Sequence, residues 1–441
     1  MTLIEKIKKG EIPEFLHRIA EDEEIPSAVL VEKILNGEVV VPYNFIHSPQ
    51  KPVAIGAGMA IKINVNIGAS FDKEDIELEK KKIDLADKLG ADAIMDLSVG
   101  RDLVRIRREL ISKSPMPFGT VPIYEAAVHG AQCGGNITNL KVDDFFTVLE
   151  NQAKDGVDFF TIHSGIDLEA IEKLKKDIRI LDVVSRGGAL LLEWMIVNQK
   201  ENPYYQYFDR VLDITKKYGV TISLGDALRP GSIFDAGDVL QYHETFIIAD
   251  LLKRAKEADV QVMVEGPGHV PLHKVEHEIK SIKEIINNAP LYVLGPLVID
   301  SAAGYDHINA AIGAAVAGYT GADFLCYLTP AEHLCLPDLE DVRDGIMAFK
   351  IAAQAVNVAR GKRKYLEREY QISKARKERN WTKQIQLALD SDKASEYRNK
   401  IPPGITDTCS MCGEYCSIKI VEAFLTKKGN EDCERSSAVE H

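Results

Sequence analysis

Three cysteines near the C-terminal end of the chain have a spacing that predicts metal chemistry. Cys409, Cys412 and Cys416 follow the pattern C-x2-C-x3-C, and Cys433 is a more distant candidate ligand. Iron–sulfur clusters are held by thiolates at such short spacings, whereas closed zinc sites usually take four ligands from two separated pairs. The triplet favours a [4Fe-4S] cluster whose open iron binds S-adenosylmethionine. A zinc site and unligated reactive thiols are the alternatives.

Two histidines stand in separate loops that each follow a short apolar run. His269 lies in E-G-P-G-H-V-P, and His333 lies in T-P-A-E-H-L. Two such histidines could share a divalent metal ion, with water or substrate completing the coordination. The alternative is that each histidine only makes hydrogen bonds within its own loop.

Two further motifs have residue types suited to substrate binding. S-R-G-G, beginning with Ser185, Arg186 and Gly187, precedes an apolar helical segment. Small residues, an arginine and a helix N-terminus together form a phosphate cradle, although an ordinary tight turn has the same composition. L-G-D-A-L-R-P-G contains Asp226 and Arg229, which either bind substrate or pair only with each other.

Short apolar runs alternate with amphipathic helical segments from about residue 61 onward, which predicts a parallel sheet covered by helices. The number of runs suggests a (β/α)8 barrel, with an open doubly wound sheet as the alternative. The predicted strands are 61–67, 93–97, 159–163, 178–184, 220–224, 260–265, 291–297 and 324–328. The predicted helices are 75–89, 142–154, 168–176, 205–218, 236–257, 273–288 and 339–359.

Polar residues cluster where these runs end, among them Asn66, Met95-Asp96, His163 and Glu265. Barrel enzymes place their chemistry at the carboxyl ends of the strands, so this register predicts a catalytic barrel. A lone histidine such as His163 is otherwise a buried, hydrogen-bonded residue. We expect an N-terminal segment at 1–58, the barrel at 59–360, and C-terminal helices with the cysteine tail at 361–435.

Composition and charge exclude several classes of partner. The 441 residues are 45% hydrophobic and 27% charged, which is typical of a globular protein with a large core. The net charge of −13 would repel a polyanion such as DNA. The chain has no apolar run long enough to span a bilayer and no secretory signal at its start. We therefore expect a cytoplasmic protein with reduced thiols and neither a nucleic-acid nor a membrane partner.

Several longer motifs resemble those of one enzyme family. They are S-L-G-D-x-L-R-P-G, V-Q-V-M-V-E-G-P-G-H-V-P, G-Y-D-H-I, C-Y-x-T-P-x-E-H-L and C-S-M-C-G, in this order and across nearly the whole chain. Together they resemble the phosphomethylpyrimidine synthase (ThiC) family, an atypical branch of the radical S-adenosylmethionine enzymes. The resemblance implies a (β/α)8 barrel, a lyase reaction on 5-aminoimidazole ribotide and an external electron donor. It also implies a homodimer in which the cluster tail of one protomer closes the active site of the other.

The resemblance further implies roles for individual residues. The cluster would be held by Cys409, Cys412 and Cys416, and an additional zinc or iron ion by His269 and His333. The catalytic residues would be Glu265, Asp226 and His163. The substrate contacts would be Asn66, Met95, Tyr124, His163, Ser185, Arg186, Gly187, Asp226, Arg229, Glu265 and Tyr292.

The sequence departs from the motifs of the thiamin enzymes beside, and not at, these positions. The departing residues are Val99, Arg101, Ser164, Ala189, Ala227, Ser301, Ala303 and Cys335. This pattern favours a related enzyme, 5-hydroxybenzimidazole synthase of anaerobic cobalamin biosynthesis, which would release formate and phosphate. The alternative is a phosphomethylpyrimidine synthase of thiamin biosynthesis with neutral drift. A rival of another class is a non-catalytic barrel with a zinc-bound tail.

Overall fold

The computed structural model describes residues 2–132, 134–176 and 179–425. The chain divides into two compact units, Met1–Arg360 and Gly361–His441, which are described separately below. The predicted division at 1–58, 59–360 and 361–435 stays a prediction, and residues 426–435 lie outside the described part. No helix among the described residues is long and apolar enough to cross a bilayer.

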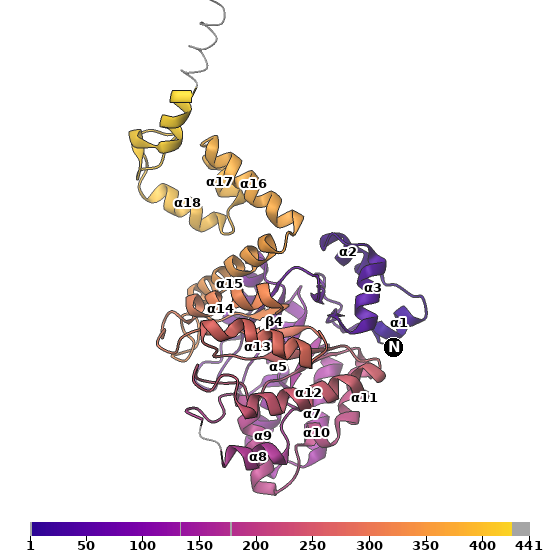
Figure 1. Ribbon diagram of the computed structural model, residues 1–441. Helices are drawn as coiled ribbons and strands as arrows, with labels where there is room; N and C mark the ends of the chain where they lie inside the picture. Colours follow the sequence, from indigo (N-terminus) through magenta and orange to yellow (C-terminus); the bar gives the residue numbers. More distant parts are fainter. Residues whose placement is uncertain (1, 133, 177–178, 426–441) are drawn as a thin grey trace, which may run out of the picture. The chain divides into compact units, whose positions relative to one another are not determined.

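The first unit contains a closed barrel of parallel strands inside a ring of helices (Figure 1). The described strands follow chain order around the barrel, and β10 pairs with β3 to close it. They are β3 Lys62–Ile67, β4 Ala93–Asp96, β5 Phe118–Thr120, β6 Phe159–Ile162, β7 Thr221–Leu224, β8 Val262–Gly266, β9 Leu291–Leu294 and β10 Phe324–Cys326. The predicted (β/α)8 barrel is confirmed, and the open doubly wound sheet is wrong.

Helices follow the strands and cover the barrel, as the alternation of the sequence predicts. They are α4 Ile76–Leu89, α5 Leu103–Lys113, α6 Pro122–Gln132, α7 Val142–Asp155, α8 Leu168–Leu174, α9 Arg186–Asn198, α10 Pro203–Gln206, α11 Phe208–Tyr218, α12 Val239–Glu257, α13 Leu272–Ile285, α14 Asp306–Thr320 and α15 Leu339–Ala359. Three of them, α5, α6 and α14, were not predicted, and α14 is rich in alanine and glycine with little polar face. Figure 1 shows α13, α14 and α15 next to one another on the outside of the barrel.

One predicted strand is wrong, and one true strand was missed. The run 178–184 begins at Ile178, which lies outside the described residues, and 179–184 form no strand. Ile180 and Leu181 are 64% and 45% exposed, so the run is apolar without being buried. The missing strand is β5, whose three residues follow Pro117 and precede Pro122. Prolines usually mark turns and edges, and they obscured this short central strand.

The N-terminal residues of the first unit pack around a small apolar core of their own. The elements are α1 Leu3–Lys8, α2 Glu14–Asp22, α3 Ser27–Asn36, and the antiparallel pair β1 Val39–Val40 and β2 Ile55–Gly56. Leu16, Leu30 and Ile34 lie in this core and are almost completely buried.

The second unit is a helical segment followed by the cysteine triplet. Its helices are α16 Arg363–Lys377, α17 Trp381–Leu387 and α18 Ser391–Lys400. Arg398 on α18 stacks 3.8 Å from the ring centre of Trp381 and donates a hydrogen bond of 2.7 Å to the carbonyl oxygen of Thr408. These contacts fix the backbone directly before Cys409.

Candidate active site

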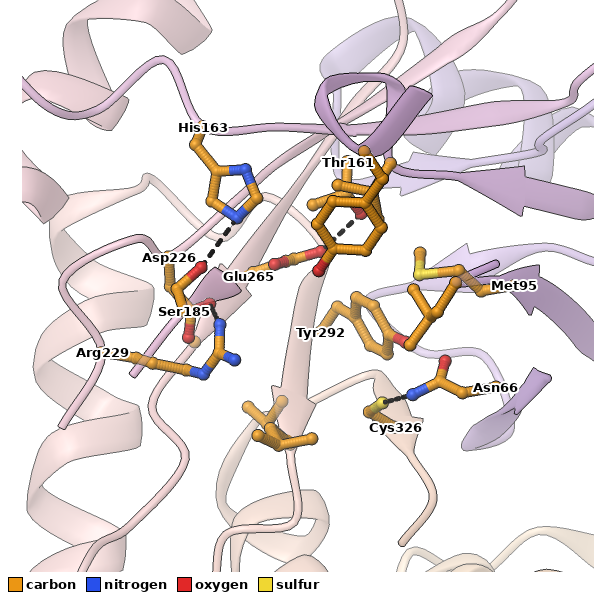
Figure 2. A pocket seen from close by; sticks show the side chains of 16 residues that line it. Asn66, Met95, Thr161, His163, Ser185, Asp226, Arg229, Glu265, Tyr292 and Cys326 are labelled. Carbon is orange, nitrogen blue, oxygen red and sulfur yellow. Dashed lines mark hydrogen bonds and ion pairs between the residues drawn. The ribbon is translucent and has the colours of Figure 1, made fainter. Parts of the chain in front are cut away.

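A cavity at the carboxyl ends of the barrel strands collects side chains from several strands and from the loops that follow them (Figure 2). It is lined by Asn66, Met95, Leu97, Val121, Tyr124, Thr161, His163, Ser185, Asp226, Arg229, Glu265, Gly266, Tyr292, Val293, Leu294 and Cys326. The parallel strands of a barrel all end at the same rim, so residues more than 200 positions apart meet there. The sequence prediction that strand-end residues converge therefore agrees with the geometry.

All the predicted substrate contacts line this cavity except Arg186 and Gly187, which lie beside it. The guanidinium of Arg186 lies 5.1 Å from the ring centre of Tyr124, which is in the cavity wall. Gly187 is buried against His163, and a Cβ atom at Gly187 would lie 2.3 Å from Cε1 of that ring. The roles of these residues in binding stay predictions.

The S-R-G-G motif forms the N-terminus of helix α9. Ser185 is the N-cap residue, and its Oγ accepts a hydrogen bond of 3.2 Å from the backbone N–H of Gly188. The free N–H groups and the positive end of the helix dipole at this position suit an anionic group. Because Ser185 also lines the cavity, a phosphate at this helix terminus would sit beside the cavity contents.

Glu265 on β8 is held by hydroxyl groups from β7, the adjacent strand, and from β6, the strand beyond it. Thr161 and Ser223 both donate to its Oε1, at 2.7 Å and 3.2 Å. Burial raises the pKa of Glu265, and the hydrogen bond from Thr161 acts in the opposite direction. A partly buried carboxyl with a raised pKa, held in place by hydroxyl donors, is suited to exchange a proton with a ligand.

Asp226 and His163 each use one polar atom in a contact with a neighbouring residue and have a second polar atom that is buried. Oδ1 of Asp226 pairs with Arg229 at 3.1 Å, and Nε2 of His163 lies 3.1 Å from Oγ of Ser185. Oδ2 of Asp226 and Nδ1 of His163 have no hydrogen-bond partner among the described residues. Burial raises the pKa of Asp226 well above its usual range and lowers the pKa of His163 to about 3. Buried polar atoms are normally paired, so these two point to a polar ligand.

Cys326 and Tyr292 form a second polar edge of the cavity. Nδ2 of Asn66 donates to Sγ of Cys326 at 3.0 Å, and Asn64 donates to the hydroxyl oxygen of Tyr292 at 2.8 Å. Burial raises the pKa of the Cys326 thiol to about 12, so it remains protonated. Sequence reasoning missed Cys326 and Thr161 as cavity residues. Thr161 could have been found because it stands two positions before His163, on the same face of its strand.

The two predicted metal-binding histidines lie next to each other. The ring centres of His269 and His333 are 5.7 Å apart. Nδ1 of His269 lies 2.8 Å from Asp300, and Nδ1 of His333 lies 3.2 Å from Asp306. A carboxylate on Nδ1 fixes the orientation of the ring and leaves Nε2 available, which is the usual arrangement of metal-ligating histidines. The donor set therefore fits a divalent ion that completes its coordination with water or substrate.

The cysteine triplet has donors suited to an iron–sulfur cluster. Cys409 and Cys416 are partly exposed and Cys412 is exposed, and all three are free thiols. A hydrogen bond from the backbone N–H of Cys412 lowers the pKa of the Cys409 thiol, which favours the thiolate that a cluster requires. Thiolates that receive backbone hydrogen bonds are typical cluster ligands, so the residues present fit the predicted group.

Another group of potential ligands was not predicted. One ligand atom each of Asp167, Glu169 and His243 lie within 4.8 Å of one another. Lys173 already contacts this group, at 2.6 Å from Nδ1 of His243 and 3.0 Å from Glu169. A lysine ammonium in contact with these groups indicates an ion-pair network between α8 and α12.

The closed barrel and the polar cavity at its strand ends define a (β/α)8-barrel enzyme. A sequence model of the radical SAM ThiC family matches residues 2–423. This chain therefore belongs to the radical SAM ThiC family, which implies S-adenosylmethionine and an iron–sulfur cluster as cofactors.

Relatives of similar length carry one name. The phosphomethylpyrimidine synthase of Caldanaerobacter subterraneus subsp. tengcongensis is 50% identical, over 96% of this chain and 98% of the relative. The protein of the same name from Archaeoglobus fulgidus is 50% identical, over 96% of this chain and 99% of the relative. Among solved structures, the dihydropteroate synthase of Stenotrophomonas maltophilia is similar at a TM-score of 0.39 and 14% identity, covering 66% of this chain and 91% of that one.

Proposed function

We propose that this protein is a phosphomethylpyrimidine synthase that rearranges 5-aminoimidazole ribotide in the barrel cavity. The observation that carries the proposal is the pair of unpartnered atoms, Oδ2 of Asp226 and Nδ1 of His163, beside the anchored carboxyl of Glu265. A ribose and an amino-substituted heterocycle supply hydroxyl and amine groups that match such atoms. The name of the relatives, which match almost the whole chain, supports the same reaction.

The residues of the cavity have distinct tasks in this proposal. Ser185, Arg186 and Gly187 bind the phosphate at the N-terminus of α9. Asp226 orients the ribose through Oδ2, and Glu265 holds or moves a proton through Oε2. When bound, the cluster and S-adenosylmethionine supply the radical that removes a hydrogen atom from the substrate. The barrel wall excludes water and keeps the reacting groups in place.

We also propose that His269 and His333 hold a zinc or iron ion. The support is the matched arrangement of a carboxylate on Nδ1 of each ring. The test is metal analysis of the purified protein beside a His269→Ala variant. Loss of one equivalent of metal, separate from the iron of the cluster, supports the site, and unchanged metal content overturns it.

A second candidate function, 5-hydroxybenzimidazole synthase, rests on the departures from the thiamin motifs. All the departing positions lie in the described part of the chain, and none of them lines the cavity. These departures favour the benzimidazole product, but no named relative gives it specific support. The names of the relatives favour the pyrimidine product. The non-catalytic zinc barrel is disfavoured by membership of an enzyme family.

One experiment separates the two products. The protein is reconstituted anaerobically with iron and sulfide and given S-adenosylmethionine, a chemical reductant and 5-aminoimidazole ribotide. A phosphorylated pyrimidine, formed with carbon monoxide and formate, supports the proposal. 5-Hydroxybenzimidazole with free phosphate and no carbon monoxide overturns it in favour of the second candidate. A Cys412→Ser variant, which loses a cluster ligand, is the control and should form neither product.

The assembly and the electron supply are further parts of the proposal. We expect a homodimer that uses an external electron donor and in which the cluster tail of one protomer serves the other. Mixing a Cys412→Ser variant with a Glu265→Gln variant tests this. Recovery of activity in the mixture supports sharing of the cluster tail between protomers. A mixed dimer of the two variants that stays inactive contradicts it.

A further inference from the structure

The loop that carries Asp226 and Arg229 is held from outside the cavity by a buried carboxyl. Glu244 on α12 is 2% exposed. Its Oε1 accepts the backbone N–H of Ala227 at 2.8 Å, and its Oε2 accepts the backbone N–H of Leu228 at 2.7 Å. Both N–H groups lie between the two cavity residues in the chain. One side chain therefore fixes the backbone from which both Asp226 and Arg229 project.

A buried arginine fixes the same loop through its carbonyl side. Nη2 of Arg179 donates to the carbonyl oxygen of Leu228 at 2.8 Å, and Nη1 donates to that of Asp182 at 3.1 Å. The guanidinium is anchored by both carboxylate oxygens of Asp238, at 2.5 Å and 2.6 Å. Asp182 stands three positions before Ser185. Arg179 thus connects the segment that leads into the α9 N-terminus with the loop after β7.

The loop after β6 packs against the same carboxyl. Gly165 follows His163 by two positions, and a Cβ atom there would lie 2.7 Å from Cγ of Glu244. The absence of a side chain at Gly165 allows this close approach. Three loops that carry cavity residues therefore meet at Glu244 and Arg179, although neither of these side chains lines the cavity.

We propose that Glu244 and Arg179 form a loop clamp that sets the relative positions of Ser185, Asp226 and Arg229, and thereby the affinity for substrate and the rate of turnover. They are positioning residues and do not touch the substrate. This inference rests on the proposed function, because it takes the barrel cavity as the substrate site. A displacement of about 1 Å at a reacting group can cost about 100-fold in rate, so a clamp of this kind has a measurable effect.

Two variants test the clamp without removing its bulk. Glu244→Gln replaces one acceptor oxygen with an amino group, which then faces a backbone N–H. Arg179→Lys keeps the charge but loses the fork that reaches two carbonyl groups and Asp238 together. We expect either change to weaken equilibrium binding of the ribotide to cluster-free protein and to lower kcat of the reconstituted enzyme. The combined loss in kcat/KM should be about 10- to 100-fold.

The matched control is Thr245→Val on the same helix. Thr245 is 7% exposed and donates only within α12, to the carbonyl oxygen of Gln241 at 2.8 Å. All three variants lose buried hydrogen bonds and should lower the unfolding temperature, Arg179→Lys most because four hydrogen bonds of Arg179 are affected. Only the two clamp variants should change affinity and kcat at temperatures well below unfolding. If they match Thr245→Val in both, the clamp is a purely structural feature and the proposal is overturned.

A measurement that needs no substrate tests the clamp separately from the proposed function. Hydrogen–deuterium exchange of the full chain should speed up at Ala227 and Leu228 in Glu244→Gln, and also at 182–187 in Arg179→Lys. Thr245→Val should exchange like the wild type in both segments. Wild-type protein that neither binds nor converts the ribotide would refute the proposed function, while exchange would still decide the clamp. Unchanged exchange in both clamp variants would refute the clamp alone.

Discussion

Replacing Gly187 with alanine tests how closely helix α9 is packed against the cavity. An alanine in a helix interior is normally more stable than glycine by about 0.5–1 kcal/mol, which is an upper bound for Gly187 in the first turn of α9. Here the added Cβ would lie 2.3 Å from Cε1 and 2.6 Å from Nδ1 of His163. Ordinary contacts of this kind are longer by about 1 Å, so the buried ring must move.

The size of the effect follows from what the moving ring loses. Overpacking a core position costs about 1–3 kcal/mol. The contact of 3.1 Å between His163 and Ser185 would also be strained, and its loss costs about 1 kcal/mol. After the gain in helix propensity is subtracted, we expect Gly187→Ala to lower the free energy of unfolding by about 1–3 kcal/mol.

Thermal unfolding at a fixed heating rate measures this change, with ribotide binding as the second readout. The matched control is Ala189→Ser, an exposed position in the first turn of the same helix. We expect the control to unfold and bind like the wild type, and Gly187→Ala to be less stable and to bind weakly. A Gly187→Ala protein that is as stable as the wild type would show that helix propensity outweighs the contact with His163, and would refute the reasoning.

Three further changes have outcomes fixed by the geometry. Because burial lowers the pKa of His163 to about 3, this ring should show no titration between about pH 5 and 8 by NMR. The contribution of His163 to the free energy of unfolding should be complete above the ordinary histidine pKa and fall by about 1.4 kcal/mol per pH unit below it, because only the unfolded chain binds a proton there. A His163→Gln variant should lack this pH dependence. Thr161→Val removes the hydroxyl that donates to Glu265 at 2.7 Å, so kcat/KM should fall about tenfold while Thr161→Ser retains activity. Asp300→Asn weakens the orientation of the His269 ring, and metal titration should show a loss of affinity of about 10- to 100-fold, whereas unchanged affinity would exclude Asp300 as its partner.

The barrel could be predicted because buried parallel strands and amphipathic helices leave regular patterns in the sequence. The predicted number of strands was correct because one wrong strand and one missed strand cancel. Ile180 and Leu181 are apolar but exposed, and Arg179 beside them is buried and holds two loops. The true strand β5 is three residues long between prolines, and only closure of the barrel reveals it. Hydrophobic patterns reflect the average burial of a segment, and they mispredict a segment whose residues hold neighbouring loops in place.

The candidate site could be predicted where its residues stand at the ends of strands. Asn66, Met95 and Glu265 stand at such ends, and the barrel brings them together. The hydroxyl of Thr161 and the thiol of Cys326 were missed because threonine and cysteine also occur as ordinary core residues. Their importance appears only through their partners, which are Glu265 and Asn66. Partners across a barrel depend on register, which one sequence does not contain.

The effect of the departures from the thiamin motifs also depends on contacts that one sequence does not reveal. Ala227 stands where the thiamin enzymes have glycine, and its methyl group packs against Gly188, where an added Cβ would lie 2.8 Å away. Its backbone N–H is held by Glu244 at 2.8 Å. A methyl group at this point cannot touch a ligand in the cavity, because Ala227 does not line it. It can change the product only by shifting the backbone that carries Asp226 and Arg229. The contacts of Ala227 with Gly188 and Glu244 oppose such a shift, so this departure by itself gives no structural reason for a different product.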